Sequence, residues 1–162
     1  MKKIVVIGQG FVGFPMSIAL SSAENKSKKK FFKVKGLEKN DNHGHSIVKK
    51  INNKILPFAT NDTQLKNYYK KCLNKNFSAT CDANVISVSD IIVVSISFNF
   101  NDKKDLKNLF DLTKLISSKI KKGSLILYET TLPPGMCEKK LYPIIKKNLK
   151  IRNFKTDDIA FA

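Results

Sequence analysis

The 162-residue sequence contains no tryptophan, three cysteines and two histidines. Cys72, Cys81 and Cys137 lie far apart and form no Cys-x-x-Cys pair, so a disulfide framework is not expected. His43 and His45 lie in a polar stretch with no cysteine beside them, and a zinc site needs clustered ligands. We therefore predict no metal site and three reduced thiols with structural roles.

Long apolar runs are also missing. No run approaches the roughly 20 residues that a transmembrane helix needs. The apolar stretch Ile4–Ile7 ends at Gly8 and is too short for the hydrophobic region of a secretion signal. Hydrophobic residues make up 42% of the chain, which is enough for a core and excludes disorder over its whole length. We therefore expect one cytoplasmic domain with no membrane partner.

Acidic residues and arginine are scarce. The chain has 13 acidic and 30 basic residues, a net charge of +17, and Arg152 is its single arginine. Because arginine reads phosphates and bases through its bidentate guanidinium group, a chain this rich in lysine is a poor reader of bases. The lysines are spread over several segments, as in the composition of a low-GC genome. We predict no specific nucleic-acid partner, while attraction of an anionic substrate stays open.

Strand-like and helix-like segments alternate along the chain, which is typical of an α/β domain with a mainly parallel sheet. Lys3–Gly8 and Asp90–Ile96 are continuous apolar, β-branched runs, as strands buried on both faces require. The other expected strands are 32–37, 77–80, 124–130 and 158–162. The expected helices are 11–22, 43–53, 62–73, 105–120 (capped by Asp102 or Asp105) and 133–149.

The first strand runs into a glycine motif, Gly8-Gln9-Gly10-Phe11-Val12-Gly13, which matches G-x-G-x-x-G and opens a helix. The first glycine allows a tight turn, the second lets the backbone approach a pyrophosphate, and the third lets helix and strand pack closely. The free N–H groups of the helix N-terminus favour phosphate binding. The sequence therefore predicts a Rossmann-type, doubly wound sheet with helices on both faces and a dinucleotide held by these six residues.

An acidic residue is expected at the end of the second strand of such a fold, and Glu38 lies there. A carboxylate at this place accepts hydrogen bonds from a ribose diol and repels a 2′-phosphate, so NAD is favoured over NADP. Lys35 and Lys39 flank it and weaken the repulsion. The alternative is a strand–turn–helix without a cofactor, in which Glu38 is merely solvated.

Four stretches add a family resemblance. Gly10–Ser17 (Gly-Phe-Val-Gly-Phe-Pro-Met-Ser), Ile51–Asn53 with Pro57, Ala79–Asp82 and Glu129–Gly135 (Glu-Thr-Thr-Leu-Pro-Pro-Gly) resemble the NAD-binding domain of the UDP-glucose/GDP-mannose dehydrogenase family. The last stretch is similar to the family's Glu-Ser-Thr-x-Pro-Pro-Gly. Within the family, the chain is most similar to the branch of the UDP-N-acetylmannosaminuronate and UDP-N-acetylgalactosaminuronate dehydrogenases.

This resemblance implies a reaction. Family members oxidise the C6 hydroxyl of a nucleotide sugar to a carboxylate with two NAD per turnover, through a thiohemiacetal on a catalytic cysteine. It also implies a catalytic role for Thr131, close to the nicotinamide. Independently, a hydroxyl at the carboxyl end of a parallel strand points into the crevice where ligands bind. Thr131 could instead cap the helix expected at Pro133, and both roles are compatible.

The chain departs from the family at one turn. Where the family usually has Val-Pro-Thr-Pro against the cofactor, this sequence has Ile96-Ser97-Phe98-Asn99, and we expect Ser97 to contact NAD there. The family's catalytic Cys and Lys, its Ser-Pro-Glu motif and its sugar-binding domain lie beyond Ala162, and no cysteine of this chain falls in a matching motif.

We therefore expect residues 1–162 to be a single NAD(P)-binding Rossmann domain. It would be the N-terminal fragment of a longer, homo-oligomeric dehydrogenase that acts on a nucleotide sugar. Without the central helical and C-terminal sugar-binding domains, the fragment is expected to be inactive and monomeric. The alternatives are a stand-alone NAD-binding regulatory module and a related β-hydroxyacid-type dehydrogenase.

Overall fold

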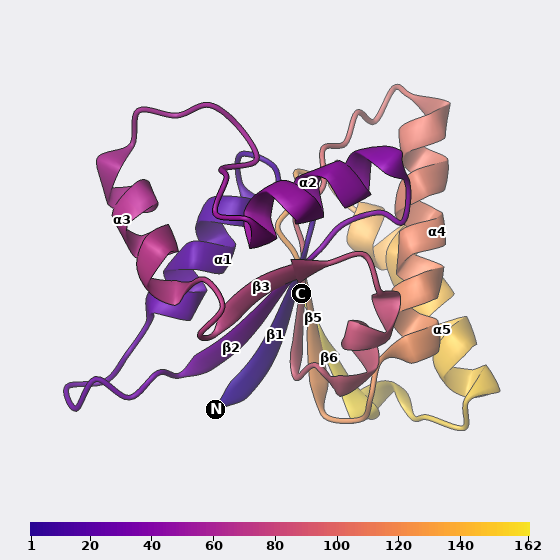
Figure 1. Cartoon of the computed structure of the whole chain (residues 1–162). Coiled ribbons are helices and arrows are strands. Elements are labelled where there is room, and N and C mark those ends of the chain that lie inside the picture. The colour runs from indigo at the N-terminus through magenta and orange to yellow at the C-terminus, as the bar shows by residue number, and fades with distance from the viewer.

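Six parallel strands form one sheet in the order β3-β2-β1-β4-β5-β6 (Figure 1). The computed structural model describes all residues from Met1 to Ala162. The strands are β1 Lys2–Ile7, β2 Phe32–Leu37, β3 Phe77–Thr80, β4 Ile91–Val94, β5 Ser124–Tyr128 and β6 Ile159–Phe161. The chain moves outward from β1 to β3 and then returns to β4 on the other side of β1. This confirms the predicted Rossmann-type topology.

Helices cover both faces of the sheet. They are α1 Gly13–Ser22, α2 Asn42–Asn52, α3 Thr63–Cys72, α4 Lys103–Lys119 and α5 Tyr142–Ile151. In Figure 1, α1 and α3 lie on one side of the strands and α4 and α5 on the other. Two short 3-10 helices, Ala83–Val88 and Thr156–Asp158, precede β4 and β6.

The central strand β1 explains why the sheet is buried on both faces. Ile4 and Val6 pack in a core cluster with side chains of α1, α2 and α3. Val5 and Ile7 point to the opposite face and pack in a second cluster with α4 and α5. All four are at most 5% exposed, so β1 has no polar face and its sequence shows no polar alternation.

Aspartate side chains begin three of the helices. Asp41 accepts a hydrogen bond from the N–H of Gly44 at α2, and Asp62 accepts one from Leu65 at α3. At α4 the cap is Asp102, the first of the two candidates. The second candidate, Asp105, accepts the N–H of Asn99 instead and so fixes the loop before the helix.

Two predicted strands end early. The strand expected to reach Ile96 stops at Val94, and the one expected to reach Thr130 stops at Tyr128. At these ends the backbone N–H groups of Glu129 and Thr130 both donate to the carbonyl of Val94, so the regular hydrogen-bond pattern between β4 and β5 ends there.

Two predicted helices begin late. The one expected from residue 11 begins at Gly13, because residues 10–12 form a turn. The helix expected at Pro133 begins at Met136, since Pro134 and Gly135 turn first and Gly135 has a φ of +78°. This last helix starts with a π-helical segment, Cys137–Leu141, that runs directly into α5.

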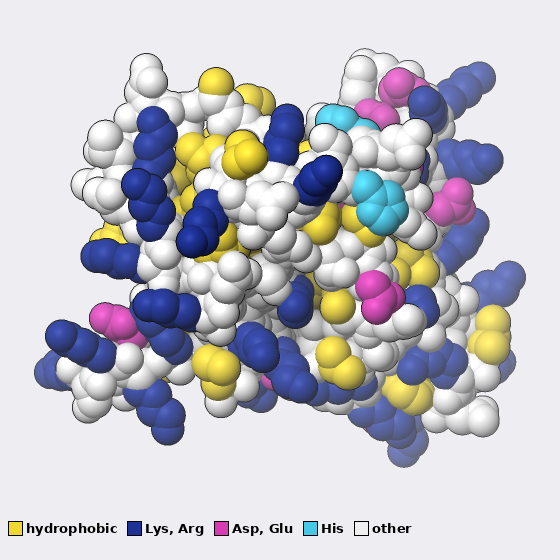
Figure 2. Space-filling view, in the orientation of Figure 1, with side chains coloured by type: hydrophobic (Ala, Val, Ile, Leu, Met, Phe, Trp, Pro, Cys, Tyr) yellow, Lys and Arg dark blue, Asp and Glu magenta, His cyan; other side chains and the backbone are white.

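Lysine side chains lie over the whole visible face in Figure 2 and do not gather on one element. This matches the spread of lysine over several segments of the sequence. No helix of the structure is long and apolar enough to cross a bilayer.

Asp90 joins three segments at the amino ends of the strands. Its carboxylate accepts the backbone N–H of Lys3 at 2.7 Å and pairs with the Lys121 ammonium at 2.7 Å. The bond from Lys121, and after it the bond from Lys3, hold the pKa of Asp90 below its usual value. Asp90 therefore links the start of β1 to the loop before β5.

Asp90→Asn is expected to lower the free energy of unfolding by about 1 kcal/mol at pH 7, less than the roughly 1.5–3 kcal/mol of a buried charged hydrogen bond, because the pair is partly exposed. Since the folded pKa lies below the unfolded value of about 3.9, this stabilisation is complete above that pH and is lost as the pH falls through the folded pKa. Urea unfolding of the variant and the unmodified chain between pH 7 and pH 3 measures this difference in the free energy of unfolding.

The matched control is Asp111→Asn, which removes an exposed ion pair with Lys114 within α4. Such a pair is worth less than about 0.5 kcal/mol. A deficit of Asp90→Asn that stays constant from pH 7 to pH 3 would contradict the assignment.

Candidate functional site

The turn after β1 requires glycine at two positions. Gly8 has a φ of +90°, and a Cβ there would lie 2.3 Å from the carbonyl oxygen of Ser95. A Cβ at Gly13 would lie 1.9 Å from the carbonyl oxygen of Gly8. The turn therefore packs against the end of β4, and α1 packs against the turn, with no room for any side chain between them.

Gly10 faces open space. No heavy atom lies within 4 Å of the place that its Cβ would occupy. The backbone N–H groups of residues 10–13 donate to no acceptor in the protein, and they lie at the positive end of the α1 dipole. Unpaired donors beside an open backbone fit a pyrophosphate group.

Glu38 lies directly beside this turn. It follows β2, and its own N–H donates to the carbonyl of Thr80 at 3.0 Å. Its Oε1 accepts the backbone N–H of Gln9 at 2.5 Å, while Oε2 has no partner in the protein. The half-buried carboxylate thus keeps one oxygen free at the carboxyl ends of β1 and β2. A free carboxylate oxygen here fits a ribose hydroxyl.

A cleft of about 500 Å³ opens at this edge of the sheet. Its walls come from the ends of β1, β2 and β4 and from one face of α4. This is the place where the strand order reverses, between β1 and β4, and open α/β sheets bind ligands at such a point. Leu112 and Leu115 supply apolar surface suited to a base, and Asp105, Asn108 and Asp111 supply polar groups. The residues present therefore fit an adenine dinucleotide.

Three of the predicted site residues line this cleft, namely Gly8, Glu38 and Ser97. Gly13 lies buried under the turn, and the Gln9 side chain is fully buried, so Gln9 can offer a ligand only its backbone. Gly10 lies exposed at the open side of the turn. The remaining predicted residues, Phe11, Val12 and Thr131, lie outside the cleft lining.

Phe11 and Val12 project into solvent, with exposed fractions of 76% and 59%. The Phe11 ring stacks at a tilt on Phe58, with centroids 4.5 Å apart. Only the backbone of these two residues lies in the turn, so their predicted contact with a cofactor is limited to their N–H groups.

Thr131 is exposed beyond the carboxyl end of β5. The helix that it was expected to cap begins only at Met136, and its hydroxyl makes no hydrogen bond within the protein, so the capping alternative is wrong. Its neighbour Thr130 is buried, and the Thr130 hydroxyl accepts the N–H of Ile96 and donates to the carbonyl of Ile96, each at 3.1 Å. Thr130 therefore holds the turn that carries Ser97.

Phe98, the next residue of that turn, packs away from the cleft. It lies against a small cluster formed by Leu109, Met136 and Leu141, between α4 and the start of the last helix. The substituted turn is thus anchored on both sides, by Thr130 and by Phe98.

The cysteines lack the properties of a nucleophile. Burial raises the pKa of Cys72 to about 11 and raises that of Cys137. Burial also raises the pKa of Cys81, which lines the cleft, and the carboxylates of Glu38 and Asp41 add to the shift. All three are unpaired thiols that stay protonated at neutral pH, as their expected structural roles require.

Helix α4 contributes residues to the cleft that were not predicted from the sequence. Asp105, Asn108, Leu112 and Leu115 are spaced three, four and three residues apart, and this spacing places them on one helical face. The periodicity was visible in the sequence, but the buried face of the same helix shows an equivalent pattern. Only the packing of α4 against β4 and β5 decides which face looks into the cleft.

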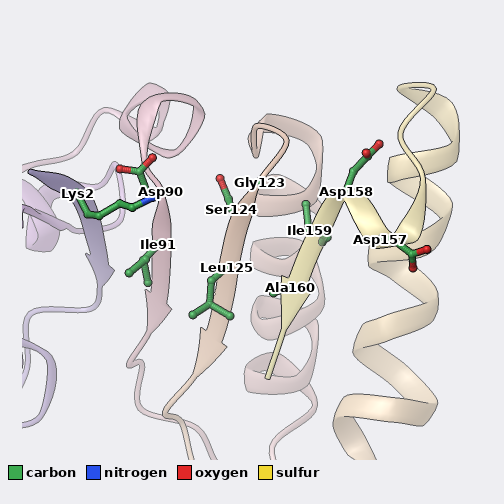
Figure 3. A pocket seen from close by; sticks show the side chains of 10 residues that line it. All are labelled: Lys2, Asp90, Ile91, Gly123, Ser124, Leu125, Asp157, Asp158, Ile159 and Ala160. Carbon is green, nitrogen blue, oxygen red and sulfur yellow. The ribbon is translucent and has the colours of Figure 1, made fainter.

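A second hollow, of about 430 Å³, lies at the amino ends of β4, β5 and β6 (Figure 3). Two of its three carboxylates are already used by the fold, and the third belongs to Asp157. Asp90 is paired as described, and Asp158 accepts the N–H of Lys155 and pairs with Lys122 at 3.1 Å, contacts that lower its pKa. This hollow therefore has a structural explanation and lies at the opposite end of the strands from the glycine turn.

Curated relatives are similar to this chain over most of its length. UDP-N-acetyl-D-mannosamine dehydrogenase of Methanocaldococcus jannaschii is 29% identical over 153 residues, which cover 93% of this chain and 33% of that protein. The enzyme of the same name from Methanococcus vannielii is 27% identical over 162 residues, with coverage of 93% and 33%. The chain thus spans about a third of the length of these relatives.

Among solved structures, an NDP-N-acetyl-D-galactosaminuronic acid dehydrogenase from Methanosarcina mazei Go1 is similar, with a TM-score of 0.84 and 25% identity. The match covers 99% of this chain and 34% of that chain. The sequence profile of the UDP-glucose/GDP-mannose dehydrogenase family, NAD binding domain, matches residues 2–161. The chain therefore belongs to the UDP-glucose/GDP-mannose dehydrogenase family and constitutes its NAD-binding domain.

Proposed function

We propose that this domain binds NAD across the carboxyl edge of the sheet, with the adenosine in the cleft and the pyrophosphate at the start of α1. The observation that carries the proposal is the position of Glu38. One oxygen of its carboxylate accepts a hydrogen bond from the glycine turn, beside the unpaired N–H groups of residues 10–13, and the other oxygen is free. The ribose and the pyrophosphate of the ADP moiety, which are adjacent to each other, thus find an acceptor and a set of donors side by side.

Each group of residues has a defined task in this proposal. Gly10, Phe11, Val12 and Gly13 donate backbone N–H groups to the pyrophosphate, and Glu38 accepts from the adenosine ribose. Ser97 contacts the cofactor at the end of β4. Thr131, exposed next to this turn, lies toward the nicotinamide half. When bound, NAD supplies a hydride acceptor for the oxidation of an alcohol.

For the longer protein, we propose NAD-dependent oxidation of the C6 hydroxyl of a nucleotide sugar to a uronate. The activity after which the relatives are named supports a UDP-linked amino sugar as the class of substrate. We further propose that residues 1–162 are one domain of a cytoplasmic homo-oligomer, and that this domain is monomeric and inactive by itself. The protonated state of its three cysteines supports the lack of activity. A stand-alone regulatory module would use the same NAD site without any turnover.

Glu38→Gln tests the ribose contact. The substitution keeps the shape of the side chain but removes its charge, so NAD affinity is expected to fall about tenfold, the value of a charged hydrogen bond of roughly 1.5 kcal/mol. NADP affinity is expected to rise, because the repulsion of the 2′-phosphate is removed. Calorimetric titration of both nucleotides measures the change.

Glu138→Gln is the matched control, since Glu138 is exposed on the π-helical segment and does not line the cleft. Its affinities are expected to equal those of the unmodified chain. Equal binding of NAD and NADP by the unmodified chain, or an unchanged ratio in Glu38→Gln, would overturn the assignment of Glu38.

Thr131→Val tests the nicotinamide end. If the Thr131 hydroxyl contacts the nicotinamide half, NAD affinity falls about threefold, which corresponds to the lower range of a single hydrogen bond. The affinity for ADP-ribose, which has no nicotinamide, is expected to stay the same. Thr63→Val, at the exposed start of α3, is the control. Parallel losses for both ligands in Thr131→Val would argue against this placement.

A further inference from the structure

Gln9 is a polar residue of the glycine turn whose side chain has no exposed surface. Its Nε2 donates to the carbonyl oxygens of Val6 at 2.9 Å and Gly8 at 3.3 Å. Its Oε1 accepts the hydroxyl of Ser17 at 3.2 Å. Every polar atom of the amide has a partner, and a fully satisfied buried network of this kind rigidifies the segments that it joins. Here it joins β1, the turn and α1.

The amide fits because β2 has a glycine opposite it. A Cβ at Gly36 would lie 2.5 Å from Cδ of Gln9 and 2.6 Å from its Oε1. Ser17, the third member, has one hydroxyl hydrogen, which it shares between Oε1 of Gln9 and the carbonyl of Gly13 at 2.8 Å, so its position on α1 is fixed. Gln9, Ser17 and Gly36 therefore form a matched set between the strand pair and the helix.

One peptide group connects this network to Glu38. The carbonyl of the peptide between Gly8 and Gln9 accepts the Gln9 amide, and the N–H of the same peptide donates to Oε1 of Glu38. Because a peptide group is planar, fixing its carbonyl also fixes the direction of its N–H.

We propose that Gln9 is a positioning residue for cofactor selectivity. Its buried amide orients the Gly8–Gln9 peptide, this peptide orients the carboxylate of Glu38, and Glu38 then distinguishes NAD from NADP. The inference rests on the proposed function, in which Glu38 binds the adenosine ribose. The Gln9 side chain itself touches no ligand.

Gln9→Met is the direct test, because methionine is similar in length and fits an apolar site but makes none of the three hydrogen bonds. NAD affinity is expected to fall about fivefold with NADP affinity unchanged or higher, so the selectivity ratio shrinks toward that of Glu38→Gln. In the Glu38→Gln background the same substitution is expected to change the ratio less than twofold, since the two side chains act through one peptide.

Ser17→Ala provides a milder variant in case Gln9→Met folds poorly. It removes one partner of the amide and is expected to lower the NAD to NADP selectivity about twofold. Ser124→Ala is its matched control: Ser124 is 1% exposed, and its hydroxyl donates to the carbonyl of Ser89 at the amino end of the sheet. Ser124→Ala is expected to change the melting temperature but not the ratio.

Calorimetric titrations of all variants below their melting temperatures separate the outcomes. A purely structural role for Gln9 would lower NAD and NADP affinities by one common factor and add to the effect of Glu38→Gln, and this result would overturn the inference alone. If the unmodified chain binds no NAD, or if Glu38→Gln leaves the ratio unchanged, the proposed function is wrong and the inference is wrong with it.

Discussion

The structure depends on the close contact between the end of β1 and the start of α1, where Gly13 lies against the carbonyl of Gly8. This contact sets the helix N-terminus directly at the carboxyl edge of the sheet, so its unpaired N–H groups face the open side of Gly10. It also brings the turn beside the end of β2, where Glu38 accepts the N–H of Gln9. The proposed dinucleotide site is therefore a consequence of backbone packing before any side chain contributes.

The charge of the site contrasts with that of the whole chain. The protein has a net charge of +17, yet Glu38, Asp105 and Asp111 line the cleft and only Lys39 opposes them there. The lysine-rich surface attracts an anionic ligand at long range, while the acidic cleft favours an uncharged adenosine over one that carries an extra phosphate. A positively charged surface combined with an acidic cleft agrees with NAD as the cofactor of the family.

The sheet, the glycine turn and the position of Glu38 were predictable because backbone constraints produce local patterns in the sequence. The alternation of strands and helices and the glycine motif predict a Rossmann-type parallel sheet, and the position of Glu38 follows from the end of β2. Side-chain directions were not predictable in the same way. The motif does not show that Gln9 points inward, toward the space left by Gly36 on another strand, or that Phe11 points outward. The paired prolines favoured a helix at Pro133, but the left-handed Gly135 delays it to Met136.

The proposed position of the dinucleotide is the glycine turn and not the similar-sized hollow at the other end of the strands. An NMR titration of the ¹⁵N-labelled chain with NAD tests this most directly. The amide signals of Gly10, Val12 and Gly13 are expected to shift together and saturate with one dissociation constant, while those of Gly123 and Ser124 stay in place. Shifts confined to Gly123, Ser124 and their neighbours would show that NAD does not bind at the glycine turn.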